Sequence, residues 1–205
     1  LNGFNSLMIL DKERCRPFDA SRAGLNLGEG AGFVVLASEK VVRETNVKPY
    51  CKVSGFGISS DAFHQTASSP EGKGSFFAME KALAMANLSA SHIDYINLHG
   101  TGTENNYLSE GTAVKILFAS AMPRVSSTKS FTGHTLGASG GIESVFSVLS
   151  LMKGIAYPNL GFENAIPELG IVPQKNYESG LSIHHVMSNS FGFGGNCSSI
   201  IFSKA

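Results

Sequence analysis

A chain of 205 residues is long enough to form one large domain or two small ones, and its 42% hydrophobic content is typical of a well-buried globular protein. Sixteen Lys and Arg balance sixteen Asp and Glu, so no net basic charge exists that would recruit nucleic acid or an anionic membrane. The apolar runs are far shorter than the ~20 residues that cross a bilayer, so we expect a soluble protein without a membrane span.

Strands and helices are predicted to alternate along the first half of the chain. Short apolar, β-branched runs predict strands over residues 32–37, 50–58 and 94–98. Helices are predicted over 38–45, where Ser38 is the N-cap, and over 75–88, where apolar residues recur on one face. A polar loop, 59–74, separates the second strand from the second helix.

The second half continues this alternation and ends in a hairpin. Helices are predicted over 109–118 and 137–153, and strands over 124–127, 183–191 and 197–203. Gly154 stands where a glycine would stop the second of these helices. Alternating β and α units followed by an antiparallel pair predict an α/β layered domain with a mixed sheet.

Three further features of the sequence indicate the compartment, the lack of a zinc site and the start of the chain. Cys15, Cys51 and Cys197 are an odd number at wide separation, which favours a reducing compartment, by default the cytoplasm. The six histidines lack the short paired spacings of zinc ligands, so we expect no zinc site. Leu1 is not followed by a leader pattern, and we expect the chain to begin partway through a longer protein.

Two glycine-rich segments resemble motifs of other protein classes. Gly28–Gly32 (GEGAG) resembles a phosphate-binding loop but precedes a strand instead of opening a helix, so we interpret it as a tight turn. The segment 137–141 (GASGG) fits the G-x-S-x-G pattern of a hydrolase nucleophile, but no strand runs directly into Ser139. We interpret it as close packing at a helix start. A serine hydrolase using Ser139 remains a lesser alternative.

Two further segments each contain a strand, then a histidine in a Gly/Thr-rich loop, then a helix. His99 follows the strand at 94–98, and His134 follows the strand at 124–127 with Lys129 between them. Ligands of α/β sheets bind beyond the carboxyl ends of the strands, so we expect both histidines to face one site. A histidine there can donate a ring N–H to a developing oxyanion or accept a proton.

Four motifs that together span nearly the whole chain carry a family resemblance. They are RPFDASRAGLNLGEGAGFVVL (16–36), INLHGTGT (96–103), TKSFTGHTLGASGGIES (128–144) and SNSFGFGGN (188–196). In this order and spacing they resemble the β-ketoacyl-acyl-carrier-protein synthases, condensing enzymes of the thiolase superfamily. The resemblance implies an acyltransferase of fatty acid or polyketide synthesis, which condenses an acyl thioester with malonyl-carrier protein as CO2 leaves.

The resemblance assigns roles to the residues that match the motifs. His99 and His134 match the histidines that donate N–H to the enolate, Lys129 matches the lysine that organises their site, and Phe193 matches a gatekeeping phenylalanine whose N–H forms half of an oxyanion hole. The positions matching the substrate side are Thr101 and Thr103, which hold the phosphopantetheine arm, the acidic Glu110, and Gly192, which lets the Phe193 loop swing.

A structural monovalent cation is the one ion that the resemblance implies, and no cofactor is required. The residues that match its ligands in some members, and that could offer oxygens to a hard ion, are Asn97, Glu143, Ser188 and Asn189.

Two departures from the family pattern stand out. The family's nucleophilic cysteine lies upstream of the Pro-Phe-Asp motif at a helix N-terminus, and no cysteine of this chain has that context. Tyr107 stands where the family usually has an aspartate, which leaves open how the neighbouring loop is held.

The family fold implies two similar halves of a layered αβαβα build, each with a mixed five-stranded sheet and helices on both faces. We expect residues 1–45 to be the end of the N-terminal half and 46–205 the C-terminal half. The partners implied are an acyl carrier protein, the missing N-terminal half and a second subunit of a full-length dimer. We expect this chain to expose the apolar surface that contacts the missing half. Such a fragment could not transfer an acyl group alone. A non-catalytic partner subunit of a condensing enzyme remains the alternative.

Overall fold

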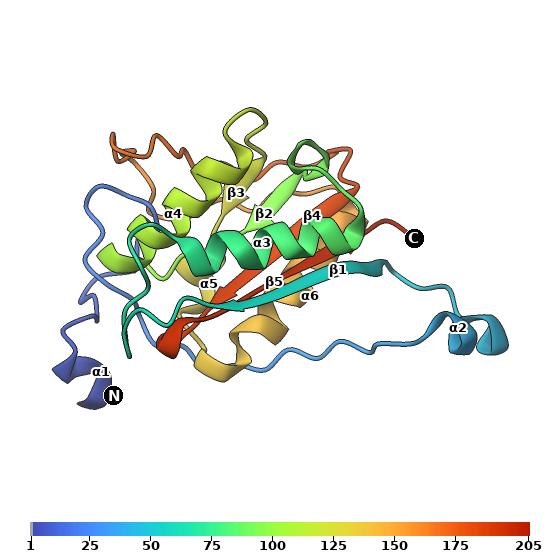
Figure 1. Ribbon diagram of the computed structural model, residues 1–205, viewed down its shortest axis with the longest axis horizontal. Coiled ribbons are helices and arrows are strands. Elements are labelled where there is room, and N and C mark those ends of the chain that lie inside the picture. The colour runs from blue at the N-terminus through green and yellow to red at the C-terminus, as the bar shows by residue number, and fades with distance from the viewer. Residues whose placement is uncertain (1) are drawn as a thin grey trace.

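The computed structural model describes residues 2–205, which contain one five-stranded mixed sheet (Figure 1). Its strands are β1 (Lys52–Ser60), β2 (Tyr95–Asn97), β3 (Arg124–Ser126), β4 (His185–Phe191) and β5 (Asn196–Ser203), in the order β1-β5-β4-β2-β3. β2 runs parallel to β3 and to β4, whereas β5 pairs antiparallel with both β4 and β1. The carboxyl ends of β2, β3 and β4 therefore meet at one edge.

The α-helices are α1 (Asn2–Ser6), α2 (Glu39–Thr45), α3 (Lys73–Ala86), α4 (Glu104–Phe118), α5 (Lys129–Thr132) and α6 (Ser139–Lys153). Short 3-10 turns are η1 (Ala90–His92), η2 (Leu136–Ala138) and η3 (Phe193–Gly195). Glycines allow the closest approach of a helix to the sheet, since a Cβ at Gly55 or Gly57 of β1 would collide with the backbone of α3.

The two faces of the sheet carry separate hydrophobic cores. Ile96, Met187 and Ile201 point to the face covered by α3 and α4, while their neighbours Tyr95, Val186 and Phe202 point to the face covered by α6. This alternation follows from the two-residue period of a strand. The central strands are thus buried between two helical layers, as predicted from the alternating β and α units, whereas α6 does not cover β1.

The segment before β1 crosses the carboxyl edge and then leaves the body of the protein. Asp19 anchors it: this buried carboxylate accepts hydrogen bonds from the N–H groups of Ser21, Glu163 and Asn164. Burial alone would raise the pKa of Asp19, but these bonds and that of the Ser21 hydroxyl outweigh it and lower the pKa to about 2.

Most predicted elements are confirmed, with boundaries shifted by a few residues. The strand predicted at 50–58 is β1, the helix at 75–88 is α3, and Ser38 caps α2 by accepting a hydrogen bond from the Val41 N–H. Gly154 ends α6 in the left-handed conformation, and β4 and β5 form the terminal hairpin. α4 begins five residues earlier than predicted, because the Thr103 hydroxyl caps it through the Asn106 N–H.

The strand predicted at 32–37 does not form. Figure 1 shows this segment extended and leading to α2, which projects away from the sheet. No other strand pairs with it within residues 2–205, so its backbone groups lack a ladder. Its apolar side chains are exposed, to 88% for Phe33 and 97% for Val35.

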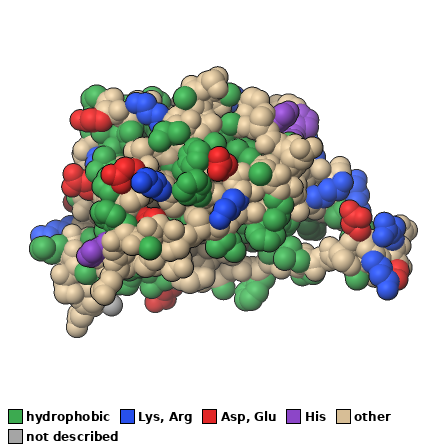
Figure 2. All heavy atoms as spheres, viewed as in Figure 1, with side chains coloured by type: hydrophobic (Ala, Val, Ile, Leu, Met, Phe, Trp, Pro, Cys, Tyr) green, Lys and Arg blue, Asp and Glu red, His purple; other side chains and the backbone are tan. Residues whose placement is uncertain are grey.

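Exposed apolar side chains also lie on β1. Val53, Phe56 and Ile58 are each at least 44% exposed, and Figure 2 shows hydrophobic side chains gathered around β1 and the extended segment. An exposed apolar surface, as expected from the resemblance, is therefore present, and surfaces of this kind mark sites of contact with other protein.

Candidate active site

Two predicted site histidines meet beyond the carboxyl ends of β2 and β3. His99 comes two residues after β2, and His134 follows α5, the single helical turn after β3. Their ring centroids lie 5.3 Å apart at an interplanar angle of 84°. The structure thus brings together the two histidines that lie 35 positions apart in the sequence, and both line the same cavity.

A buried ion pair fixes the chemical state of His99. The Lys129 ammonium pairs with the Glu143 carboxylate and donates to His99 Nδ1 at 3.3 Å, and Lys129 is only 1% exposed. An ammonium carries only donors, so Nδ1 of His99 must be the acceptor and the ring proton sits on Nε2. Burial first, and then the Lys129 charge, hold the pKa of His99 well below its usual range, which keeps the ring neutral.

His134 is fixed in the same tautomer by different groups. Its Nδ1 accepts the Leu136 N–H at 3.2 Å and lies 3.0 Å from the Ser139 hydroxyl. The Nε2 of this ring therefore carries the proton as well. Burial and the Lys129 charge lower the pKa of His134 to about 4. Two neutral rings, each with an Nε2–H donor, therefore line the cavity side by side.

Glu110 shapes the loop that carries His99. Its buried carboxylate accepts the His99 and Gly100 N–H groups, both at 2.8 Å, and receives amide hydrogen bonds from Asn106 and Asn189. Burial raises the pKa of Glu110, and these hydrogen bonds oppose that rise. Glu110 thus positions the His99 backbone from beneath, which is a contact the sequence motif did not indicate.

The two predicted threonines and the Phe193 loop line the same cavity. The hydroxyls of Thr101 and Thr103 lie 2.9 Å apart. Phe193, 48% exposed, stacks on Phe4 of α1 with ring centroids 6.3 Å apart. Gly192 N–H donates to the Asn196 carbonyl at 2.7 Å, and Gly194 adopts a φ of 77° beside the phenylalanine. These residues surround a cavity of about 1120 Å³.

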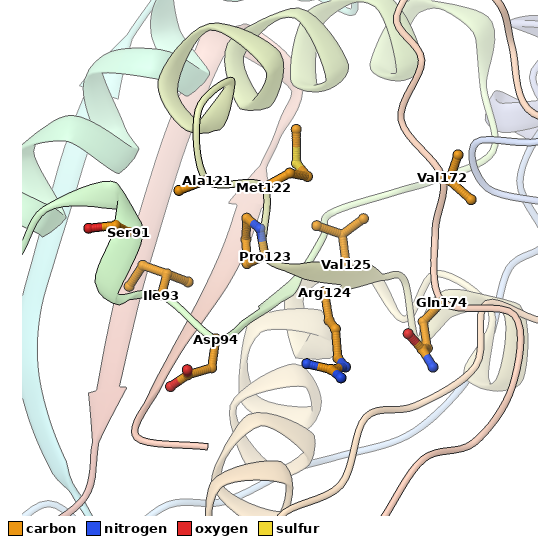
Figure 3. A pocket seen from close by; sticks show the side chains of 10 residues that line it. All are labelled: Ser91, Ile93, Asp94, Ala121, Met122, Pro123, Arg124, Val125, Val172 and Gln174. Atoms are coloured by element: carbon orange, nitrogen blue, oxygen red, sulfur yellow. The ribbon is translucent and has the colours of Figure 1, made fainter. Parts of the chain in front are cut away.

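A second cavity, of about 520 Å³, lies at the opposite edge of the sheet (Figure 3). Asp94, Arg124 and Gln174 line it beside apolar side chains from the turn before β3. None of the predicted site residues lines it.

The four predicted cation ligands can be compared with an ion's needs. Asn97 lies opposite Ser188 in the β2–β4 pair, and Asn189 follows in β4. Glu143 Oε2 is buried without a hydrogen-bond partner in the described residues, so one anionic oxygen is free for an ion. The carbonyl oxygen of Asn189 accepts the Ser199 hydroxyl and keeps a second lone pair, whereas that of Asn97 already accepts both the N–H and the hydroxyl of Thr128. The oxygens of Glu143 and Asn189 thus fit a small monovalent cation.

Other metal or thiol chemistry finds no such support in residues 2–205. No group of three or more His, Cys, Asp or Glu side chains is arranged to hold a metal ion there. Burial raises the pKa of Cys15 and Cys51, and that of Cys197 to about 11, so none of the three is poised as a thiolate. Within this part of the chain no helix is both long and apolar enough to cross a membrane.

Two histidines meet at the carboxyl edge of a mixed sheet, backed by a buried ion pair and opening on a large cavity. They define a thiolase-like site that can polarise a carbonyl. The family described as "Beta-ketoacyl synthase, C-terminal domain" matches residues 50–163. The chain belongs to the beta-ketoacyl synthase family.

Curated relatives support this assignment. The chain is 42% identical over 194 residues to 3-oxoacyl-[acyl-carrier-protein] synthase 2 of Staphylococcus aureus, covering 93% of this chain and 46% of the relative. It is 43% identical over 191 residues to the enzyme of the same name from Rhizobium meliloti, covering 92% and 45%. The chain thus spans about half the length of the curated relatives it matches.

Solved structures share the fold over the whole chain. The ishigamide ketosynthase/chain length factor superposes with a TM-score of 0.94 at 30% identity, covering 100% of this chain and 50% of that one. A beta-ketoacyl synthase from Burkholderia phymatum gives 0.88 at 32% identity, covering 99% and 51%. The expected thiolase-like half is confirmed, while the exact division at residue 45 stays a prediction.

Proposed function

We propose that this chain supplies the decarboxylating half of a ketoacyl synthase site, acting on malonyl thioesters carried by an acyl carrier protein. The pairing of His99 and His134 as neutral Nε2–H donors carries the proposal. Both donors would point to the thioester carbonyl oxygen, where negative charge develops. The names of the relatives, 3-oxoacyl-[acyl-carrier-protein] synthases, support the same chemistry.

The proposed reaction starts at the malonyl group. The bond between its α-carbon and carboxylate breaks, CO2 leaves, and the electron pair forms an enolate whose oxygen accepts the His99 and His134 N–H groups. The α-carbon then attacks the carbonyl of an acyl thioester, a C–C bond forms, and the thiolate leaves. Because burial and the Lys129 charge lower both pKa values, each ring is neutral at neutral pH and keeps a single N–H, which the enolate oxygen would accept.

The remaining predicted site residues would serve the acyl and carrier groups. Thr101 and Thr103 would bind the amides of the phosphopantetheine arm. The Phe193 N–H, which has no acceptor in the described part of the chain, would donate to the acyl thioester oxyanion, while its ring gates the cavity beside Phe4. Glu110 and Lys129 would position His99. The nucleophile would lie outside this chain. The full-length protein would act in the cytoplasm as a dimer.

The test uses the full-length protein, which is the product of the complete reading frame that contains this chain. It measures the release of CO2 from malonyl-pantetheine. Removing one such donor costs about 10²–10³-fold in rate, so His134→Ala should lose that much. His185→Ala removes a histidine from the opposite edge of the sheet and should leave the rate unchanged. A His134→Ala rate equal to wild type would contradict the proposal.

A partner subunit without catalysis is the second candidate. The observation that favours it is that ketosynthase neighbours are described together with chain length factors. The lack of a poised thiol among Cys15, Cys51 and Cys197 fits both candidates. Intact mass after incubation with an acyl thioester decides: a stoichiometric adduct on the full-length protein supports the enzyme, and none supports the partner subunit.

The monovalent cation proposed at Asn97, Glu143, Ser188 and Asn189 would neutralise the free oxygen of Glu143. It would act on structure alone. We expect potassium to raise the melting temperature relative to choline at equal ionic strength, and Glu143→Gln to abolish that difference.

A further inference from the structure

Tyr107, which stands where the family usually has an aspartate, packs through its aromatic ring. Its ring is 2% exposed and meets Phe18 edge-on, with centroids 5.5 Å apart, and its hydroxyl donates to the Ile166 carbonyl at 3.4 Å. The guanidinium of Arg22 lies over the same ring, 4.4 Å from its centroid. Aromatic packing thus holds this loop, which answers the question left open by the sequence.

The positive charge of the Arg22 guanidinium has no ion-pair partner among the described residues. Its Nη1 donates to the Asp19 carbonyl at 3.2 Å, and its Nε is buried without a hydrogen-bond partner among the described residues. Among residues 2–205, no carboxylate lies within 4.0 Å of it. A guanidinium has five N–H donors in a planar fork that suits phosphate or carboxylate, so most of its capacity to bind an anion is unused.

Arg22 also lines the large cavity, at the threonine end of the His99 loop. The Gly24 N–H donates to the Gly102 carbonyl at 3.1 Å, which ties the segment carrying Arg22 to that loop. Tyr107, beneath the guanidinium, is one helical turn beyond Thr103 in α4. Tyr107 itself does not line the cavity, whereas Arg22, whose guanidinium packs on the Tyr107 ring, does.

We propose that Arg22 binds the phosphate group of the phosphopantetheine arm. This inference rests on the proposed function, which puts the thioester at His99 and His134 and the arm's amides at Thr101 and Thr103. Apart from a malonyl carboxylate at the thioester end, the phosphate is the arm's anionic group. An arm that passes the threonines presents that phosphate at the end of the loop where Arg22 stands.

Glu104 is the opposing charge in this part of the cavity. Glu104 lines the cavity together with Arg22 but forms no ion pair with it. The Glu104 charge weakens an anion's affinity without occupying the guanidinium, so Glu104→Gln should tighten phosphate binding through Arg22.

The experiment compares 4′-phosphopantetheine with pantetheine, which differ only in the phosphate, by calorimetric titration of the full-length protein. One charge-assisted hydrogen bond corresponds to about tenfold in affinity, so phosphopantetheine should bind about tenfold more tightly. Arg22→Gln should bring the ratio of the two affinities near one, and raised salt should shrink it in wild type. Tyr107→Phe keeps the ring beneath Arg22 and should retain the ratio.

Three results would overturn the inference. Equal affinities in wild type, or a ratio that Arg22→Gln does not change, would refute the phosphate contact while leaving the proposed function standing. Failure of both compounds to bind would refute the arm site of the proposed function as well. Coenzyme A and a loaded carrier protein present this phosphate from two sources, and the one whose affinity falls in Arg22→Gln is the ligand.

Discussion

Two pairs of histidine rings stand at opposite edges of the same sheet with similar geometry. His99 and His134 lie 5.3 Å apart at 84° beyond the carboxyl ends, and His92 and His185 lie 6.4 Å apart at 84° near the start of β4. Serine hydroxyls meet Nδ1 atoms in both pairs: Ser139 lies 3.0 Å from His134, and in the second pair Ser203 lies 2.8 Å from His185 and Ser89 lies 2.8 Å from His92.

The surroundings of the two pairs differ in burial and charge. His99 is 6% exposed and contacts the ammonium of Lys129, whereas His92 is exposed and His185 half-buried beside Asp94. Burial lowers the pKa of His185, but the Asp94 charge opposes that shift. Ring geometry alone thus does not make a site. A neutral, oriented donor pair needs a cation and a dry cavity wall as well.

The largest expected difference between the two edges is in how much their ion pairs stabilise the fold. The pairs are Lys129–Glu143 and Arg124–Glu178. Lys129→Met leaves the buried Glu143 carboxylate without its counter-ion and should lower the free energy of unfolding by about 3–5 kcal/mol. Arg124→Met breaks the exposed pair with Glu178, whose atoms are 3.0 Å apart, and should lower the free energy of unfolding far less, because solvent screens that pair. Urea unfolding of both variants measures the difference.

The double variant Lys129→Met/Glu143→Gln is the control, since it removes the charge on both partners. It should recover a large part of the loss, because no buried charge then lacks a partner. A double variant as unstable as Lys129→Met would show that lost packing, not the stranded carboxylate, dominates.

The histidines at the two edges should also differ in how they make the free energy of unfolding depend on pH. The folded-state pKa of His134, about 4, lies below the usual value of 6.5, so the unfolded chain binds more protons between these values. The stability that His134 contributes is complete above pH 6.5 and is lost as pH falls toward 4. His134→Gln should flatten this part of the stability profile, measured by urea unfolding at each pH.

His185→Gln is the matched comparison, because the pKa of His185 is also lowered but Asp94 opposes the shift. Its profile should stay closer to wild type. Asp19 loses its contribution only below about pH 4, toward its own pKa of about 2, so it does not confuse the window. An unchanged slope in His134→Gln would contradict the neutral state of that half-buried ring.

Local sequence patterns predicted the frame of this site because the frame follows from strand ends. β2 and β3 are parallel, and residues just beyond their carboxyl ends share one edge, so His99, Lys129 and His134 had to approach one another. The contact of Arg22 with Tyr107 joins positions 85 apart, and the Asn159 side chain donates to the Pro17 carbonyl across 142 positions. No local pattern encodes such contacts, because they depend on how loops pack over a finished sheet.

The predicted strand at 32–37 failed for a related reason. Its β-branched composition expresses a preference for extended backbone, and the segment is extended, but a strand also needs a neighbour to pair with its N–H and C=O groups. Composition reports the first requirement and is silent on the second.

The smallest expected effect separates the two serine contacts. Ser139→Ala removes one hydroxyl from His134 Nδ1 but leaves the Leu136 N–H, so the tautomer should persist while the ring loses orientation. Loss of one such hydrogen bond, about 1 kcal/mol, should slow decarboxylation of malonyl-pantetheine by about fivefold with little change in KM. Ser203→Ala removes the corresponding hydroxyl from His185 and should leave the rate unchanged.

Nitrogen-15 spectra of the histidine rings give a readout independent of activity. In Ser139→Ala the His134 signals should still report a proton on Nε2, and a switch to Nδ1 would mean that the hydroxyl, not the backbone N–H, sets the tautomer. A fluorophosphonate probe that labels wild type at Ser139 would instead identify this serine as a nucleophile. The lowered pKa of His134, to about 4, makes it a weak base for that role, so we expect no labelling.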